Sequence, residues 1–182
     1  MIRMEVMPMA FDAITTPGSI IKDIAVISVD SYIEARGEIW TSYTPAVFDG
    51  LMPISFCHDK FSVSKKNVLR GIHGDHKSWK LISCPFGEIT AVVVDLREHS
   101  ASYKMHEMFR LGADVRQQIL IPPGVGNSFY VHSEFALYHY KLAYHGEYAD
   151  ADDQFTVAWN DPELNIMWPC EDPILSERDA RL

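Results

Sequence analysis

The chain has 182 residues, of which 47% are hydrophobic and 23% are charged. These values are ordinary for a folded protein, so they argue against wholesale disorder, and the length fits one domain better than two. The formal net charge of −9 argues against nucleic acid or an anionic membrane as the main partner. A small phosphate ligand is not excluded, because a pocket needs only a few local cations. No apolar run reaches about 18 residues, so no membrane-spanning helix is predicted.

The three cysteines, Cys57, Cys84 and Cys170, are widely spaced and form no CxxC motif. An odd number of scattered cysteines is typical of reduced thiols and of neither a disulfide framework nor a zinc ribbon. We therefore expect a cytoplasmic protein.

The predicted elements begin after a short leader. Residues 1–19 lack the apolar segment and cleavage context of a secretion signal, and we expect them to form a flexible arm. From residue 20 onward, short segments rich in β-branched and aromatic residues alternate with turn signals such as Pro122-Pro123-Gly124. Helical turns are expected only within residues 133–137 and 174–182. The predicted strands cover residues 20–30, 37–43, 54–64, 67–74, 89–96, 117–123, 127–133, 135–144 and 154–160.

So many short strands at close spacing predict a single all-β domain over residues 20–182. A cupin-type jelly-roll β-barrel fits this pattern best, and the mouth of such a barrel is a natural site for a small molecule.

The densest polar cluster spans residues 68–80 and includes Arg70, His73 and Lys80. Such side chains are costly inside a barrel unless a ligand uses them, whereas on a solvated strand end they are ordinary. Arg70 and His73 have opposite parity along a strand. Both can face one pocket only if a bend or bulge at Gly71 intervenes.

The histidines also suggest a metal site, and the spacing argues against it. A metal-binding cupin usually offers two histidines two residues apart and a third after a late Pro-x-Gly turn. Here His73 and His76 are three apart, and Asn127 follows the late turn. We therefore expect no bound metal. The remaining histidines considered as ligands are expected at strand surfaces or in solvent: His132, His139 and His145.

Two further clusters become informative only in combination with the first. Alternation places Tyr138 and Tyr140 on one face of a strand and His139 and Lys141 on the other. Aromatic residues at this spacing usually belong to the core. The charged tail over residues 173–179 would ordinarily be solvated, but its first three residues form an apolar segment that can hold it against the barrel.

Taken together, these stretches resemble the dTDP-4-dehydrorhamnose 3,5-epimerase family. Each motif alone is weak, but eight occur in the family's order and at close to its spacing over about residues 20–180. They are RGE (36–38), SVSKKNVLRGIH (62–73), GE (87–88) leading to VDLR (94–97), IPPG (121–124), YK (140–141), WNDP (159–162), IMWP (166–169) and LSERD (175–179).

The resemblance implies a homodimeric β-barrel that uses no metal or other cofactor. Its substrate would be a nucleoside-diphospho-4-keto-6-deoxy-sugar, dTDP- or GDP-linked, inverted at C3, C5 or both for the synthesis of bacterial surface polysaccharides. In the implied roles His73 is the catalytic base, Asp179 orients it, Lys80 stabilises the enolate and Tyr140 is the general acid. The residues expected to bind substrate are Arg70, Arg36, Lys60, Asn127 and His58, with Arg36 reaching the nucleotide from an arm shared between subunits.

These residue types suit that chemistry. A proton beside a ketone becomes removable when a fixed cation such as Lys80 meets the charge that develops on the C4 oxygen. Histidine is neutral and basic near working pH, and a carboxylate on its other ring nitrogen sets the tautomer. A tyrosine hydroxyl stays protonated at neutral pH and can return a proton from the opposite face.

Several positions depart from the family pattern. After His73 the chain has Gly-Asp where the family has Tyr-Gln, and residues 58–61 read His-Asp-Lys-Phe where it has Gln-Asp-Asn-His. Asn127 replaces a histidine, and Ala91 replaces an inward aspartate. These variants look like a subgroup acting on GDP-linked 4-keto sugars, including heptoses of bacterial capsules. The alternatives are a sister 3-epimerase, 5-epimerase or ketoisomerase, a metal-dependent cupin enzyme, and a non-catalytic sugar-nucleotide-binding barrel.

Overall fold

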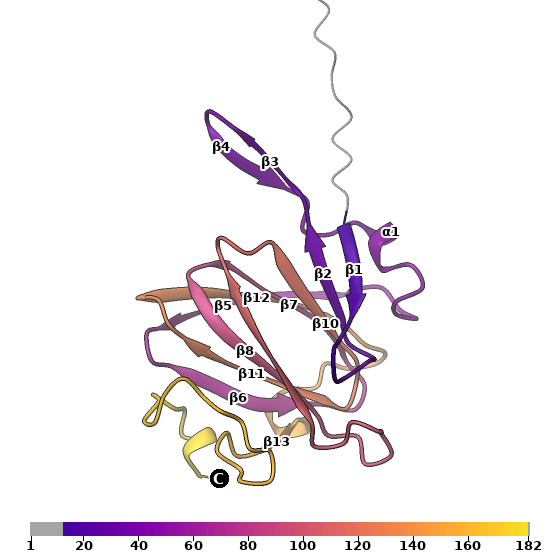
Figure 1. Ribbon diagram of the computed structural model, residues 1–182. Helices are drawn as coiled ribbons and strands as arrows, with labels where there is room; N and C mark the ends of the chain where they lie inside the picture. Colours follow the sequence, from indigo (N-terminus) through magenta and orange to yellow (C-terminus); the bar gives the residue numbers. More distant parts are fainter. Residues whose placement is uncertain (1–12, 182) are drawn as a thin grey trace, which may run out of the picture.

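The computed structural model describes residues 13–181, which form two facing β-sheets and a projecting hairpin (Figure 1). The first sheet contains β1 (Ala13–Pro17), β2 (Ala25–Val29), β10 (Gln117–Ile121), β7 (Trp79–Phe86), β12 (Phe135–Ala143) and β5 (His58–Lys65), in that spatial order. The second contains β13 (Phe155–Thr156), β6 (Leu69–Gly74), β11 (Val125–Val131), β8 (Glu88–Asp95) and β9 (His106–Gly112), also in spatial order. The hairpin is β3 (Ser31–Glu34) with β4 (Gly37–Trp40).

The chain crosses repeatedly between the two sheets. Strands β5 and β7 lie in the first sheet and β6 and β8 in the second, and β10, β11 and β12 alternate in the same way. Neighbouring strands run antiparallel, and the two sheets face each other without closing into one hydrogen-bonded ring. This is the predicted all-β jelly roll of the cupin type.

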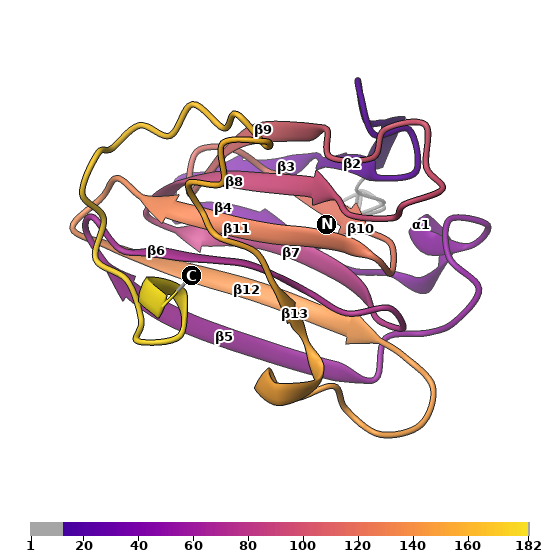
Figure 2. The same cartoon turned by 90° about the horizontal axis from the view of Figure 1, so that it is seen from below.

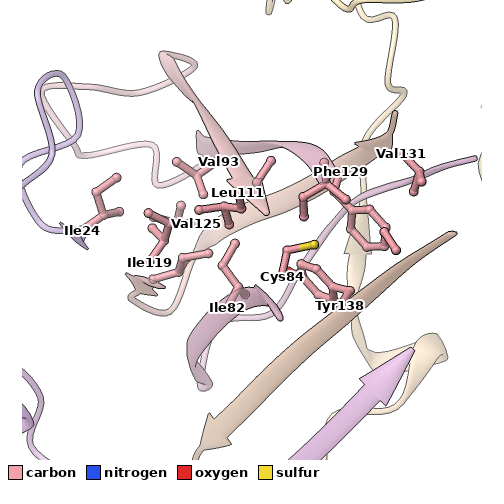
Figure 3. Packing of buried hydrophobic residues seen from close by; sticks show 14 of the residues in the cluster. Ile24, Ile82, Cys84, Val93, Leu111, Ile119, Val125, Phe129, Val131 and Tyr138 are labelled. Atoms are coloured by element: carbon pink, nitrogen blue, oxygen red, sulfur yellow. The ribbon is translucent and has the colours of Figure 1, made fainter. Parts of the chain in front are cut away.

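The main core fills one end of the space between the sheets (Figure 3). On β7, Ile82 and Cys84 point into it, and on β8, Ala91 and Val93 meet them from the opposite sheet. Residues of one parity on each strand therefore build the core, as period-two geometry requires. The other end of the same space holds polar side chains and forms the cavity described below.

Strand β8 is apolar on both faces because the C-terminal segment covers its outer side. Val92 and Val94 pack outward against Leu164, together with Ile72 of β6. Figure 2 shows this segment running across the outside of the sheet that contains β6, β11 and β8. A continuous apolar run is the expected signature of a strand that is buried on both faces.

The predicted strands omit four that the structure contains: β1, β3, β7 and β9. The segment that forms β7 contains Lys80, Ser83 and Pro85, which dilute the β-branched pattern even though its inward positions are buried. Residues 133–137 were predicted as a helical turn, and this is wrong, because Phe135 begins β12. The two helical turns not predicted are α1 (Pro45–Phe48) and η1 (Ala151–Asp153), and the tail holds η2 (Asp179–Arg181) within the predicted range 174–182.

The predicted N-terminal arm is folded in its last part. Residues 13–17 form β1, which pairs with β2 over its whole length. The next residues are held by Glu107, whose carboxylate accepts hydrogen bonds from the backbone N–H groups of Ser19, Ile20 and Ile21 at 2.6–2.9 Å. Residues 1–12 lie outside the described residues. Residues 13–181 contain no helix with the length and apolarity to span a membrane.

Candidate active site

A cavity of about 220 Å³ opens at the polar end of the space between the sheets. The predicted site residues on its wall come from β6, β7, β11, β12 and the C-terminal turn η2: Arg70, His73, Lys80, Asn127, Tyr140 and Asp179. Six of the nine residues predicted from sequence therefore meet in one place.

Strand β6 brings Arg70 and His73 to the same face through the bulge that their parity requires. Arg70 lies opposite Phe129 on β11, and His73 lies opposite Asn127, so three steps on β6 match two on β11. The extra residue falls at Gly71, whose φ of +112° is disfavoured for residues with a side chain. A Cβ atom there would stand 2.7 Å from the carbonyl oxygen of Asn127.

His73 and Asp179 form a hydrogen-bonded pair, although 106 residues separate them. The Nε2 atom of His73 lies 2.6 Å from Oδ1 of Asp179, which is a short hydrogen bond. The side chain of Asp179 is 2% exposed and that of His73 is 24% exposed, so the histidine is the more accessible member of a pair that lines the cavity.

Backbone pairing, more than an apolar clamp, holds the tail in place. Ile174 forms a parallel bridge with Val68, donating its N–H to Asn67 at 2.8 Å and accepting the N–H of Leu69 at 3.1 Å. The side chain of Ile174 is 56% exposed, so the predicted apolar clamp is wrong at this residue, while Pro173 is buried.

The carboxylate of Asp179 is held in its charged form. Burial opposes ionisation, but hydrogen bonds from His73, Ser176 and the backbone N–H of Gly71 outweigh it, so the pKa of Asp179 lies below its usual range. The hydroxyl of Ser176 donates to Oδ2 at 2.9 Å, which leaves Oδ1 for the imidazole. A charged acceptor at Nε2 favours the tautomer whose proton sits on Nε2.

Lys80 projects from β7 into the cavity and is almost fully buried. Its Nζ donates to Oδ1 of Asn127 at 3.2 Å and stands 4.0 Å from Oδ2 of Asp75. Burial lowers the pKa of the Lys80 ammonium, and the Asp75 carboxylate opposes that change. A buried cation without full compensation interacts strongly with any anion that enters the cavity.

Strand β12 supplies two tyrosines on its inward face, as alternation predicts. Tyr138 is buried, stacks on Phe129 at 4.3 Å between ring centroids, and accepts a hydrogen bond from Nδ2 of Asn127 at 3.1 Å. Tyr140 is half-buried beside the cavity, and burial raises the pKa of its phenol. Its hydroxyl makes no hydrogen bond within residues 13–181, which leaves it free to meet a ligand.

The outward residues of β12 take no part in the cavity. His139 was expected at a strand surface, and it is on the outer face of the first sheet, yet it is buried under Phe61. Its ring bonds Asp59 at 2.5 Å and Ser83 at 3.3 Å, and Lys141 also pairs with Asp59.

The predicted binding residues differ in how they relate to the cavity. Arg70 donates from Nε to Ser64 at 2.9 Å, which holds its guanidinium at the wall. Lys60 donates to the hydroxyl of Tyr148 at 2.9 Å, and that tyrosine lines the cavity. His58 bonds Tyr144 and is not part of the cavity wall. Arg36 is not on the cavity wall, because it stands at the tip of the β3–β4 hairpin with its side chain 86% exposed.

Nine of the fifteen wall residues were not among the predicted site residues, and four of these nine are polar residues outside the strands: Asp75, Tyr148, Gln154 and Ser176. In the sequence Asp75 stands out only as a departure from the family motif, although a carboxylate two residues after a candidate base is a usable signal. Tyr148 and Gln154 lie in loop sequence without a pattern. Within residues 13–181, no three His, Cys, Asp or Glu side chains gather closely enough to hold a metal ion.

Known proteins resemble this chain in both sequence and fold. The family model described as dTDP-4-dehydrorhamnose 3,5-epimerase matches residues 19–182. The chain belongs to this family. The family's Escherichia coli member, named dTDP-4-dehydrorhamnose 3,5-epimerase, is 34% identical over 168 residues, covering 89% of each chain.

Solved epimerase structures are equally similar. The dTDP-6-deoxy-D-glucose-3,5-epimerase of Legionella pneumophila, in complex with dTDP-4-keto-L-rhamnose, superposes with a TM-score of 0.87 at 30% identity, covering 93% of this chain and 91% of that one. The dTDP-4-dehydrorhamnose 3,5-epimerase of Bacillus anthracis, with TDP and pyrophosphate bound, gives 0.85 at 32% identity, covering 92% and 97%. The chain is therefore an epimerase of the isomerase class with a cupin-like jelly-roll fold.

Proposed function

We propose that this epimerase inverts C3 and C5 of a dTDP-4-keto-6-deoxy-sugar by removing and returning protons beside the ketone. The observation that carries the proposal is the His73–Asp179 pair at 2.6 Å, facing a cavity that also receives Lys80 and Tyr140. A base, its orienting carboxylate, a cation and a phenol are the groups that this reaction requires.

The base is Nδ1 of His73. Nε2–H of His73 donates its hydrogen bond to the Asp179 carboxylate, so the lone pair of the ring is on Nδ1, the remaining nitrogen. When Nδ1 accepts a proton from carbon, the imidazolium that forms is stabilised by the carboxylate beside it.

Lys80 assists the removal of the proton, and Tyr140 returns a proton to the carbon. The ammonium of Lys80 stabilises the negative charge that moves onto the C4 oxygen when the carbon loses its proton. Inversion needs a new proton on the opposite face of the sugar, and the phenol of Tyr140 supplies it. Burial raises its pKa, which keeps the phenol protonated at neutral pH.

The nucleotide is held by the cations at the rim. Arg70 presents a planar guanidinium suited to bidentate contact with a phosphate, and Lys60 adds a second charge beside Tyr148. The three relatives described above are named for a dTDP-sugar or bind dTDP-4-keto-L-rhamnose or TDP, which favours dTDP over the GDP suggested by the altered residues 58–61.

We also propose a homodimer in which the β3–β4 hairpin reaches the partner subunit. The hairpin projects from the sheets (Figure 1) and exposes Tyr32, Ile33 and Ile39 at 52%, 75% and 48%. Such an apolar ribbon is poorly suited to water, and a second copy would bury it and bring its Arg36 toward a nucleotide. The free thiols of all three cysteines fit the expected cytoplasmic location, where the product would enter the synthesis of surface polysaccharides.

The test is incubation of the protein with dTDP-4-keto-6-deoxyglucose in D₂O, followed by proton NMR of the sugar. The proposal predicts loss of the C3 and C5 proton signals and appearance of the L-configured product. Loss at one carbon only would make the protein a 3- or 5-epimerase, and exchange with the GDP-linked sugar alone would reassign the nucleotide. No exchange with either substrate would favour a non-catalytic binding barrel.

A further inference from the structure

Asp75 is a buried carboxylate in the turn between β6 and β7, 5% exposed, and none of the roles above uses it. Its Oδ1 accepts the backbone N–H groups of Lys77 at 3.0 Å and of Ser78 at 2.7 Å. These two bonds fix the orientation of the side chain. They also leave Oδ2 directed to Lys80, 4.0 Å from its Nζ.

A compensating charge stabilises the ammonium form of the buried Lys80 side chain. The side chain is 8% exposed, and burial disfavours its charged form. Within residues 13–181, Asp75 is the one carboxylate within 4.0 Å of Nζ. The other ionisable groups on the same cavity wall are Arg70, His73, Tyr138, Tyr140, Tyr148 and Asp179. Of these, Asp179 already serves His73, and the rest are cationic or neutral at pH 7.

The three protons of the ammonium can be assigned. One goes to Oδ1 of Asn127 at 3.2 Å, and the Asn127 amide is itself oriented by donating to Tyr138 at 3.1 Å. A second is drawn toward Asp75. The third has no acceptor in the described part of the chain, and it is the one left for a substrate oxygen in the cavity.

We propose that Asp75 is a positioning residue that keeps Lys80 protonated and, together with Asn127, aims its remaining N–H bond into the cavity. The proposal rests on the proposed function for the catalytic part, because it gives Lys80 the role of meeting the C4 oxygen. The charge relation between the two side chains stands independently of the reaction.

The turn and the charge can be separated by substitution. Asp75→Asn keeps an Oδ1 acceptor for the two backbone N–H groups and removes only the negative charge. Asp75→Ser is a second uncharged variant that retains a turn-capping oxygen, and Asp75→Glu restores the charge. The matched control is Glu163→Gln, which removes an exposed carboxylate paired with Lys104 outside the cavity wall.

Two readouts test the proposal in the intact protein. The ¹³Cε signal of Lys80, followed by NMR against pH without substrate, should titrate at lower pH in Asp75→Asn and Asp75→Ser than in wild type. Asp75→Glu and Glu163→Gln should titrate as wild type. In turnover, the alkaline limb of the kcat profile should move to lower pH in the same two variants. The kcat on that limb should fall about tenfold for each unit of pKa displacement, with KM little changed.

An unchanged Lys80 titration in both uncharged variants overturns the proposal, whatever their activity. A wild-type protein inactive on every nucleotide sugar overturns the proposed function instead, while the NMR titration still decides whether Asp75 sets the charge of Lys80. A moved titration with an unmoved alkaline limb overturns the catalytic part, because Lys80 protonation would then not matter for turnover.

Discussion

Replacing Asp179 with Asn tests the pair that the proposed reaction depends on most. The change keeps the size of a side chain that is 2% exposed and removes the charge 2.6 Å from Nε2 of His73. If the amide turns its oxygen to the ring, the tautomer survives without the stabilising charge. If it turns its NH₂ group, the proton moves to Nδ1 and the base is blocked.

The magnitude follows from the hydrogen bond that is weakened. A bond to a charged group contributes about 1.5–3 kcal/mol, and each 1.36 kcal/mol is a tenfold change in rate, so kcat should fall about 10- to 150-fold from the lost charge alone. A blocked tautomer lowers it further. KM should change little, because Asp179 is almost fully buried, bonds His73, and is not one of the cations proposed to hold the nucleotide.

The assay is initial-rate deuterium exchange into the 4-keto sugar, with kcat and KM measured separately. Asp172→Asn is the matched control, since it makes the same chemical change at an exposed position of the same tail. A kcat for Asp179→Asn equal to that of the control would refute the assignment. So would a loss that appears only in KM.

Three other substitutions make distinct predictions. Tyr140→Phe should keep deuterium exchange at the substrate carbons while net inversion falls, as the first proton can leave without the acid; equal loss of both, by NMR, would place Tyr140 in both steps. Gly71→Ala should lower the free energy of unfolding, measured in urea, by about 1–3 kcal/mol, because the φ of +112° is strained for alanine and the new Cβ meets Asn127. An unfolding midpoint equal to that of wild type would contradict the bulge. Asp95→Asn should lower the free energy of unfolding by about 3–5 kcal/mol near pH 7, because Arg97 loses the charge of its fully buried partner. Despite burial, hydrogen bonds lower the pKa of Asp95 in the folded state, so its charge contributes to stability above the ordinary value of 3.8 and ceases to do so on acidification below it. The difference in free energy of unfolding between wild type and Asp95→Asn should therefore narrow below that pH. A difference that does not depend on pH would contradict the charge as its source.

The alternation of side chains along a strand was enough to predict which residues of β12 share a face. The alternation on β12 separates Tyr138 and Tyr140 from His139, and the structure keeps that separation. The odd spacing of Arg70 and His73 also predicted a bend or bulge at Gly71, because a regular strand would point the two side chains to opposite faces. The structure has the bulge. Local physics of this kind is visible in a sequence because neighbours along a strand are fixed in space.

Contacts between residues far apart in the sequence could not be predicted from local pattern. Nothing near Asp179 indicates a buried carboxylate, and only the resemblance to a family placed it beside His73. The reason it is ordered is the backbone bridge from Ile174 to Val68, which no side-chain pattern encodes. Asp75 went unassigned because its importance comes from Lys80, which sits on a strand that the pattern did not reveal.

The most direct test of the proposed reaction compares wild type with His73→Asn in one experiment. Both proteins are incubated with dTDP-4-keto-6-deoxyglucose in D₂O, and deuterium at C3 and C5 is counted by NMR after their folds have been matched by circular dichroism. The assignment of His73 as base predicts full labelling by wild type and labelling at the uncatalysed rate by the variant. Labelling by His73→Asn at a rate close to wild type would contradict it.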